Sequence, residues 1–376
     1  MPLQLAVLKD SKQGETRAAA TPETVKKYVA LGIDVEVETG VGEAAGFLDA
    51  AYAENGATVV SAKEAGTKAD IVLSVNAPDG GKVSALQQGA VLLAMLDPHN
   101  NKDQINAYAK AGLKAMAMEL MPRITRAQSM DVLSSQSNLA GYKSVLDATG
   151  VYGRALPMMM TAAGTIAPAK IFVMGAGVAG LQAIATARRL GAVVSATDVR
   201  AAAAEQVESL GASFVMVEQD ADDSGETAGG YAKEMSEDYQ KRQAALVSEH
   251  IAKQDIVICT ALIPGRKAPV LVSKEQAESM RPGSVIVDLA VEQGGNCVLS
   301  KPGEVVEHKG VKIVGHTNVP GRLAGNASEL YARNLYNFVE TFFDTESGSL
   351  NLDDQDEIIA GIALTRDGAV VHPAIS

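Results

Sequence analysis

The chain has 376 residues, of which 47% are hydrophobic and 21% charged, and its formal net charge is −12. This length suffices for two domains of ordinary size, and the acidic balance argues against nucleic acid or an anionic membrane surface as a direct partner. The lack of Trp and the many Ala, Val and Gly residues favour α/β layers.

The cysteines and the N-terminal residues indicate in which cellular compartment the protein is expected. Cys259 and Cys297 are too few for a disulfide framework, and Cys259 lies in an apolar run that predicts a buried thiol, so a reducing compartment is expected. The first residues, MPLQLAVLKD, lack a basic segment before an apolar one, so no export signal is predicted. Residues 171–187 are uncharged, but their glycines and Gln182 favour a strand–turn–helix unit over direct membrane insertion.

The first third of the chain alternates apolar, strand-like runs with helical segments. A strand is predicted at residues 3–8, and Thr21 can cap a helix that has Pro22 at its first position and runs to Gly32. This alternation is typical of a doubly wound parallel sheet. Further strands are expected at residues 35–38, 58–60, 71–75, 91–96 and 113–116, and helices at 50–55, 62–68, 102–111 and 134–155, with a loop at 157–169.

The stretch from Lys170 to Arg200, KIFVMGAGVAGLQAIATARRLGAVVSATDVR, holds the strongest motif. A strand-like run precedes glycines at GxGxxG spacing, and a helical run and a second apolar run ending at Asp198 follow; the glycines are Gly175, Gly177 and Gly180. They permit a tight turn, a close approach to a pyrophosphate at the helix N-terminus, and close helix–strand packing. Asp198 would accept hydrogen bonds from the ribose hydroxyls, which favours NAD over NADP, although Arg200 could pair with a 2′-phosphate. A glycine-rich turn in an ordinary α/β domain is the alternative.

The rest of the chain completes the predicted architecture. Strands are expected at residues 214–217, 256–261, 285–288 and 312–314, and helices at 232–252 and 324–343, the last returning to the N-terminal domain. Apolar segments 358–365 and 369–371 flank Arg366-Asp367-Gly368, a hairpin signal. This hairpin either docks on a second subunit, giving a homodimer, or closes the chain's own sheet edge.

The predicted fold class is α/β, with two doubly wound parallel-sheet (Rossmann-like) domains, a cleft between them and a C-terminal β-hairpin. Residues 1–135 plus 324–376 form the N-terminal α/β domain, and residues 136–323 form the NAD(H)-binding Rossmann domain. Residues 118–142, which join the domains, are rich in polar groups. A crevice between domains suits a nicotinamide ring, and a solvated linker with a helix cap is the alternative.

Several blocks of the chain resemble, in order and spacing, the NAD(H)-binding component of the proton-translocating NAD(P) transhydrogenase family. They are RITRAQSMD…SSQSNLAGY, PMMMTAAGTIAPAKIFVMGAGVAGLQAIATARRLGA, TDVR, ETAGGYAKEM, TALIPGR, GSVIVDLAVEQGGNC and GHTNVPGR. The resemblance covers nearly the whole chain. It implies direct hydride transfer between NAD(H) on this chain and NADP(H) on a partner subunit.

The resemblance also implies which residues form the site. Arg123, Gln128, Asp131 and Ser134 would be the catalytic residues around the nicotinamide. Asp131 would hold the carboxamide, Arg123 would pair with Asp131 or reach the pyrophosphate, and Gln128 would project toward the second nucleotide. The implied NAD(H) contacts are Arg123, Gln128, Ser129, Met130, Asp131, Ser134, Gly175, Gly177, Val178, Gly180, Asp198, Val199, Arg200, Gly230, Tyr231, Gln243 and Leu262.

Gly230 and Tyr231 end an acidic segment, EQDADDSGETAGG, that lacks helical or strand periodicity. The family resemblance implies a mobile loop here, and a lid that excludes water from the ring is the favoured interpretation. A surface loop without function is the alternative.

Hydride transfer between two nicotinamides needs no general acid, base or metal, only ring carbons about 3–3.5 Å apart. The five histidines are scattered without metal-ligand spacing, so no metal is expected. The chain carries one dinucleotide fingerprint, so the second nucleotide must arrive on another polypeptide. The resemblance implies an NADP(H)-binding subunit and a separate membrane-spanning subunit that moves protons. This chain would then be held by protein contacts at the cytoplasmic face of the inner membrane.

Two other functions compete with this one. An alanine dehydrogenase is related, and Arg17 matches the arginine that holds the substrate carboxylate in that family. The expected catalytic lysine is missing from IVLSVNAP and the expected histidine from LLAMLDP, which argues against amine oxidation. Arg17 would then be a relic or part of a structural ion pair. A non-catalytic NAD(H) sensor would share the fold and the lid.

Overall fold

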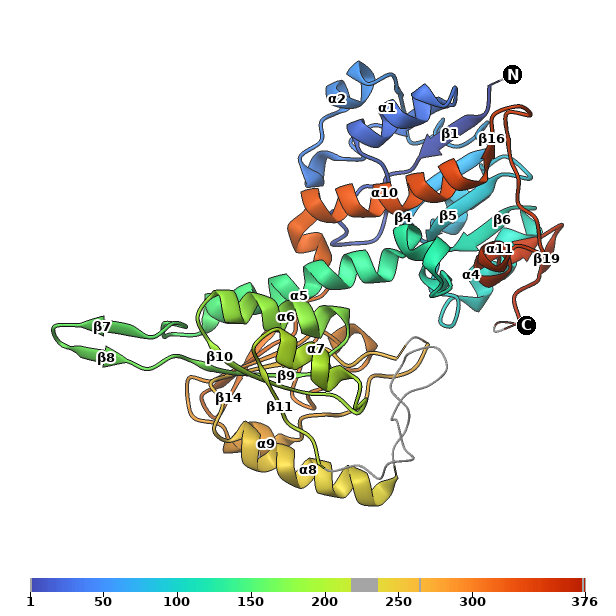
Figure 1. Ribbon diagram of the computed structural model, residues 1–376. Helices are drawn as coiled ribbons and strands as arrows, with labels where there is room; N and C mark the ends of the chain where they lie inside the picture. Colours follow the sequence, from blue (N-terminus) through green and yellow to red (C-terminus); the bar gives the residue numbers. More distant parts are fainter. Residues whose placement is uncertain (1, 218–235, 264, 374, 376) are drawn as a thin grey trace. The chain divides into compact units, whose positions relative to one another are not determined.

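The computed structural model describes residues 2–217, 236–263, 265–373 and 375, which form two compact units (Figure 1). The first unit comprises Met1–Gln136 and Pro320–Ser376, and the second comprises Ser137–Val319. The predicted lid, with Gly230 and Tyr231, lies outside the described residues. No helix in the described ranges is long and apolar enough to cross a membrane.

The first unit contains a parallel sheet with strand order β3-β2-β1-β4-β5-β6. Strands β2 and β3 are added on one side of β1, and β4, β5 and β6 on the other, so the strand order switches between β1 and β4. This is the doubly wound arrangement predicted from the sequence. The strands are β1 (Gln4–Val7), β2 (Asp34–Glu38), β3 (Thr58–Val60), β4 (Ile71–Asn76), β5 (Val91–Met95) and β6 (Lys114–Ala117). The helices are α1 (Pro22–Ala30), α2 (Asp49–Glu54), α3 (Gly80–Val83), α4 (Lys102–Lys110), α10 (Ala324–Phe342) and α11 (Glu357–Ile362).

Local chemistry explains two of these helices. The Thr21 side chain accepts a hydrogen bond from the Thr24 amide and forms a capping box, which confirms the predicted start of α1 at Pro22. Helix α10 returns to the first unit, as expected, because Tyr331, Leu335 and Phe338 bury their side chains in the same core as β1 and β4. Figure 1 shows α10 lying beside α1 and β4.

The C-terminal hairpin lies against β6, the edge strand of the sheet in the first unit, which agrees with one of the two expected arrangements. Its strands are β18 (Thr365–Arg366) and β19 (Ala369–Val370), and Asp367 and Gly368 take φ values of 49° and 79° in the two-residue turn. The Thr365 hydroxyl donates to the Leu113 carbonyl and accepts from the Ala115 amide of β6. The apolar segment before the hairpin is the helix α11.

The second unit contains a seven-stranded sheet with order β11-β10-β9-β12-β13-β15-β14, in which only β14 is antiparallel. The strands are β9 (Lys170–Met174), β10 (Val193–Thr197), β11 (Ser213–Phe214), β12 (Ile256–Cys259), β13 (Val285–Asp288), β14 (Val305–His308) and β15 (Val311–Val314). The helices are α5 (Val132–Val151), which starts in the first unit, α6 (Val178–Arg189), α7 (Ala203–Ser209), α8 (Glu237–Ile251) and α9 (Lys274–Ser279). Cys259 is fully buried, as predicted.

Besides residues 358–362, which were grouped with the hairpin but lie in α11, two predicted segments are wrong. Residues 62–68 form successive turns and no helix, because the Gly66 amide donates to Glu36 Oε1 on β2 and leaves the helical hydrogen-bond ladder. Residues 157–169 were predicted as a loop, but they contain an antiparallel ribbon of β7 (Met159–Thr161) and β8 (Gly164–Ile166).

Candidate functional site

The glycine-rich turn of the second unit has the geometry of a phosphate-binding turn. Gly175 directly follows β9 with a φ of 105°, and its carbonyl accepts a hydrogen bond of 2.9 Å from the Thr260 hydroxyl. A Cβ on Gly180 would lie less than 3.0 Å from that same carbonyl, so only glycine lets α6 pack there. Gly177 precedes α6 with no side-chain cap, which leaves the first amides of the helix for an anion.

Asp198 follows β10 directly, at the position expected for ribose recognition. Its side chain is 7% exposed and accepts hydrogen bonds from the Ala176 amide at 2.7 Å and the Arg200 amide at 2.9 Å. Burial alone raises the pKa of Asp198, but the guanidinium and backbone of Arg200 and the Ala176 amide outweigh it and lower the pKa. Asp198 is therefore a preformed, ionised acceptor at the end of β10.

Arg200 bears on the choice between NAD and NADP. Its Nε and Nη2 atoms each lie 2.9 Å from a carboxylate oxygen of Asp198, in a bidentate pair. A guanidinium held in this way supports the carboxylate, and a 2′-phosphate would have to approach beside that negative charge. Val199, between the two residues, is only partly buried.

Three further residues of the second unit were expected to contact the nucleotide. Gln243 on α8 donates to the Thr197 hydroxyl at 2.8 Å and accepts from the Val217 amide at 3.2 Å, so it fixes the end of β10. Leu262, which follows β12, is 41% exposed, and Val178 at the start of α6 is 39% exposed. Both can present an apolar surface to a bound nucleotide.

Asn296 is a residue that sequence reasoning missed. It is fully buried, accepts from the Ala261 amide, and donates to the carbonyls of Ala261 and Pro269. It thereby fixes the loop that carries Leu262. The only signal in the sequence was its place after Gly294-Gly295, which does not reveal a partner some 35 residues away.

The polar segment of the first unit begins with a 3₁₀ turn, η3 (Thr125–Met130), and continues into α5. Asp131 precedes α5 and accepts from the Ser134 amide at 2.9 Å and the Ser134 hydroxyl at 2.5 Å, which is the geometry of a helix N-cap. The side chains of the segment divide by exposure. Arg123, Gln128 and Ser129 are exposed, whereas Met130 is buried in the core.

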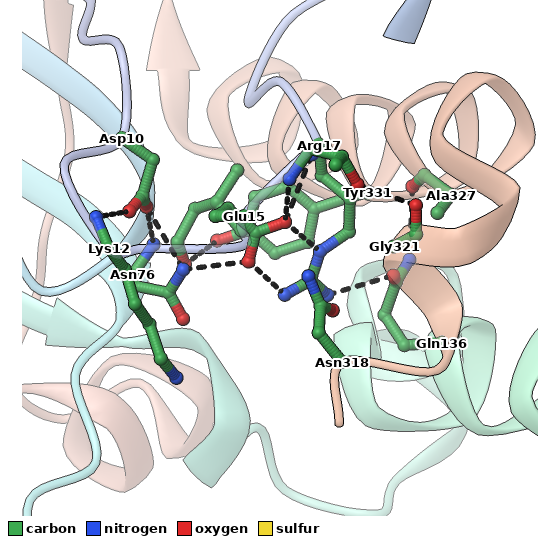
Figure 2. Close-up of polar contacts among 12 residues, drawn as sticks. Asp10, Lys12, Glu15, Arg17, Asn76, Gln136, Asn318, Gly321, Ala327 and Tyr331 are labelled. Atoms are coloured by element: carbon green, nitrogen blue, oxygen red, sulfur yellow. Dashed lines mark hydrogen bonds and ion pairs between the residues drawn. The ribbon is translucent and has the colours of Figure 1, made fainter. Parts of the chain in front are cut away.

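A buried polar network lies at the carboxyl ends of β1 and β4, where the strand order of the first unit's sheet switches sides (Figure 2). Arg17 donates from Nε and Nη2 to Glu15, at 2.8 and 2.7 Å, and from Nη1 to Gln136 at 3.0 Å. Asn76 donates its side-chain amide to both Glu15 and Asp10. Arg17 is thus in a structural ion pair, which was one of the two expected alternatives.

The ionisation of Glu15 follows from this network. Burial raises the pKa of the carboxyl, but the hydrogen bonds and charge of Arg17, with the Asn76 amide, outweigh burial and bring the pKa to about 2. Asn76 and Gln136 were not predicted as members of this network, because 61 residues separate Glu15 from Asn76 and 119 separate Arg17 from Gln136.

Two of the histidines contact a polar side chain. His250 lies 2.7 Å from the Ser195 hydroxyl, and His308 lies 2.7 Å from Glu278. Within the described ranges, no group of three or more His, Cys, Asp or Glu residues is arranged to hold a metal ion.

Comparison with known proteins gives matches over both units. The family model described as "Alanine dehydrogenase/PNT, N-terminal domain" matches residues 6–140, and "Alanine dehydrogenase/PNT, C-terminal domain" matches residues 144–373. A protein of Rhodospirillum rubrum, named as the first part of NAD(P) transhydrogenase subunit alpha, is 54% identical over 100% of this chain and 99% of the relative. The protein of the same name from Rickettsia prowazekii is 45% identical, over 98% and 96%.

Alanine dehydrogenases are more distant. "Alanine dehydrogenase 1" of Staphylococcus aureus is 28% identical, over 89% of this chain and 86% of the relative. Among solved structures, a transhydrogenase from Sinorhizobium meliloti superposes with a TM-score of 0.86 at 54% identity, covering 99% of both chains. An L-alanine dehydrogenase superposes with a TM-score of 0.82 at 27% identity, covering 99% of this chain and 98% of the other.

Proposed function

The chain belongs to the alanine dehydrogenase/PNT family, and we propose that it is the NAD(H)-binding subunit of a proton-translocating NAD(P) transhydrogenase. Hydride passes directly between NAD(H) on this chain and NADP(H) on a partner subunit, and a separate membrane component translocates protons. The observation that carries the proposal is the 54% identity to the first segment of a transhydrogenase alpha subunit over the whole chain. Identity to an alanine dehydrogenase is only 28%.

The proposed NAD(H) domain spans residues 136–323, and residues 1–135 with 324–376 form the other domain. The glycine turn holds the pyrophosphate, and Asp198, Val199 and Arg200 hold the adenosine end. The N-cap geometry of Asp131 supports a role in holding the carboxamide, because its carboxylate is already ordered by Ser134. Gln128 and Arg123 are exposed, so that a second nucleotide and the pyrophosphate can reach them.

The proposed location is the cytoplasmic face of the inner membrane, through contacts with the NADP(H)-binding and membrane-spanning subunits. Relatives support a multi-subunit assembly, because two proteins named as the first segment of a divided alpha subunit match over 99% and 96% of their length. The relative named "NAD(P) transhydrogenase subunit alpha" in Haemophilus influenzae is longer, and this chain covers 72% of it.

A homodimer belongs to the proposal, and the β7–β8 ribbon is its proposed contact. Figure 1 shows this ribbon extending away from the rest of the second unit. An isolated two-stranded ribbon is marginally stable in water. Met160 and Ile166 on the ribbon are 79% and 45% exposed, and Met158, just before it, is 61% exposed. Packing against a second copy of the chain would cover these side chains.

Replacing Met158, Met159 and Met160 with Ser is expected to convert the dimer to a monomer, as measured by light scattering after gel filtration. The matched control is Val371→Ser beside the C-terminal hairpin, where Val371 is 47% exposed and the mass should stay dimeric. A dimeric mass for the triple variant would reject the ribbon as the contact.

Hydride exchange tests the function directly. The purified chain is mixed with an NADP(H)-binding transhydrogenase subunit, and transfer from NADH to an NADP analogue is followed by absorbance. Gln128→Asn is expected to slow exchange about tenfold with NADH affinity nearly unchanged, because shortening the side chain by one methylene disturbs ring alignment. Binding without exchange in the wild-type protein would favour a sensor, and NADH oxidation driven by pyruvate and ammonia would favour alanine dehydrogenase.

Asp198→Ala is expected to weaken NADH binding by about 1–3 kcal/mol, the scale of a charged hydrogen bond. The variant also loses the charge that opposes a 2′-phosphate, so the ratio of NADPH to NADH affinity should rise. Both affinities can be measured by fluorescence titration. Glu205→Ala on α7 removes the same charge from an exposed position and serves as the control. Equal NADH affinity in wild type and Asp198→Ala would show that Asp198 does not contact the ribose.

A further inference from the structure

One amide on α10 contacts both ends of the segment that carries the proposed nicotinamide residues. Asn334 is 8% exposed. Its Nδ2 donates to the Ser129 carbonyl at 2.8 Å, and its Oδ1 accepts from the Ser135 hydroxyl at 2.7 Å. Ser129 lies next to Gln128, and Ser135 lies next to Ser134, so Asp131 is on the short stretch between the two contacts.

We propose that Asn334 is a positioning residue for hydride transfer, which rests on the function proposed above. By donating at one end and accepting at the other, the amide fixes the separation between the end of η3 and the first turn of α5. Helix α10 is a rigid base for this clamp, because it has 19 residues and buries Tyr331, Leu335 and Phe338 in the core. The clamp holds Gln128, Asp131 and Ser134 in one arrangement before NADH binds.

A neighbouring amide provides a built-in comparison. Asn337, one turn further along α10, also donates to the Ser129 carbonyl, at 2.9 Å, but it is only partly buried. A carbonyl oxygen has two lone pairs and can accept both bonds. Asn337 therefore supports one end of the segment, whereas Asn334 joins the two ends.

Asn334→Asp is the sharpest test, because it preserves shape and the acceptor for Ser135 but places an ionised oxygen against the Ser129 carbonyl. The holocomplex with the NADP(H)-binding subunit should show kcat for exchange lowered about tenfold or more, since small displacements of reacting groups are costly. The KM for NADH should rise, but by a smaller factor than kcat falls. Asn337→Asp is the matched control and should stay within about twofold of wild type in kcat, because the half-buried side chain at 337 can turn toward solvent while Asn334 keeps both of its bonds.

A second readout separates positioning from general damage and does not need the partner subunit. ADP-ribose lacks the nicotinamide, so its affinity for Asn334→Asp should equal that for wild type, while the ratio of NADH to ADP-ribose affinity falls. Equal losses for both ligands, or a wild-type kcat in the variant, would overturn the proposal. If Asn334→Asp does not fold by circular dichroism, Ser135→Ala removes the same clamp from the other side and must lower kcat.

Failure of the function itself would be recognised separately. In that case the wild-type holocomplex would show no exchange, whereas the affinity ratio would still report whether Asn334 orders the segment.

Discussion

Replacing Glu15 with Gln is expected to lower the free energy of unfolding by about 3–5 kcal/mol at pH 7, because it leaves the buried guanidinium of Arg17 without its counter-charge. The side chains of Glu15 and Arg17 are only 2% and 7% exposed. Glutamine keeps the shape and one oxygen acceptor, but its amide group faces the guanidinium with N–H donors. The variant therefore loses the negative charge and one hydrogen-bond acceptor beside Arg17, in a buried site where water does not replace them.

The same pair predicts how stability depends on pH. The pKa of Glu15 falls from 4.5 to about 2 in the folded protein, despite burial, which by itself raises it, because the hydrogen bonds and charge of Arg17 outweigh burial. A lowered folded pKa means that the contribution is complete above the unfolded pKa and is lost as pH falls toward 2. The shift corresponds to about 3 kcal/mol. Wild type should therefore lose more stability than Glu15→Gln between pH 5 and pH 2.

Urea unfolding at pH 7, 5 and 2.5 measures both effects. The difference between wild type and Glu15→Gln should be largest at pH 7 and 5 and should shrink at pH 2.5. Glu23→Gln is the control, because Glu23 also pairs with a cation, Lys27, but its side chain is 59% exposed. An exposed pair of this kind contributes about 0–1 kcal/mol. A difference below about 1 kcal/mol for Glu15→Gln at pH 7 would contradict the importance of the buried pair.

The sheets were predictable because their signal is local. Fully buried parallel strands appear as short apolar runs, so residues 285–288 were predicted with the bounds that β13 shows. The start of α1 was predictable for the same reason, since Thr21 and Pro22 act on their immediate neighbours.

The errors came from interactions that a local pattern does not contain. The β7–β8 ribbon was missed because its turn, Ala162-Ala163, lacks the glycine or asparagine that usually signals a hairpin, and because its side chains are exposed and show no alternation. Residues 358–362 were grouped with the hairpin, but Asp356 accepts from the Ile358 amide and starts the helix α11 there.

In the candidate site, too, local features were predictable and long-range contacts were not. The roles of Gly175 and Gly180 depend on backbone a few residues away, so their spacing predicted the turn. The contact between Asn334 and Ser129 joins residues 205 positions apart, and no periodicity in the sequence relates them. Asp198 directly follows β10, at the strand end that the apolar run before it predicted.

Gly180→Ala is expected to lower both stability and NADH affinity, because the new Cβ has no space. It would lie less than 3.0 Å from the carbonyl oxygen and carbon of Gly175, which are backbone atoms of the turn after β9. Backbone cannot rotate away as a flexible side chain can, so α6 must shift from the sheet. Overpacking of this kind costs about 1–3 kcal/mol or more. The shift also displaces the amides at the start of α6, so NADH affinity should fall at least about tenfold.

Gly150→Ala separates this steric effect from the general consequence of replacing a helical glycine. Gly150 lies in α5 with nothing within 4 Å of its Cβ position, so alanine there should stabilise the helix by about 0.5–1 kcal/mol. In thermal unfolding, Tm should therefore fall for Gly180→Ala and rise for Gly150→Ala. In NADH titration, only Gly180→Ala should lose affinity. Unchanged NADH binding in Gly180→Ala would mean that the start of α6 does not hold the pyrophosphate, because the turn cannot keep its geometry with a side chain at that position.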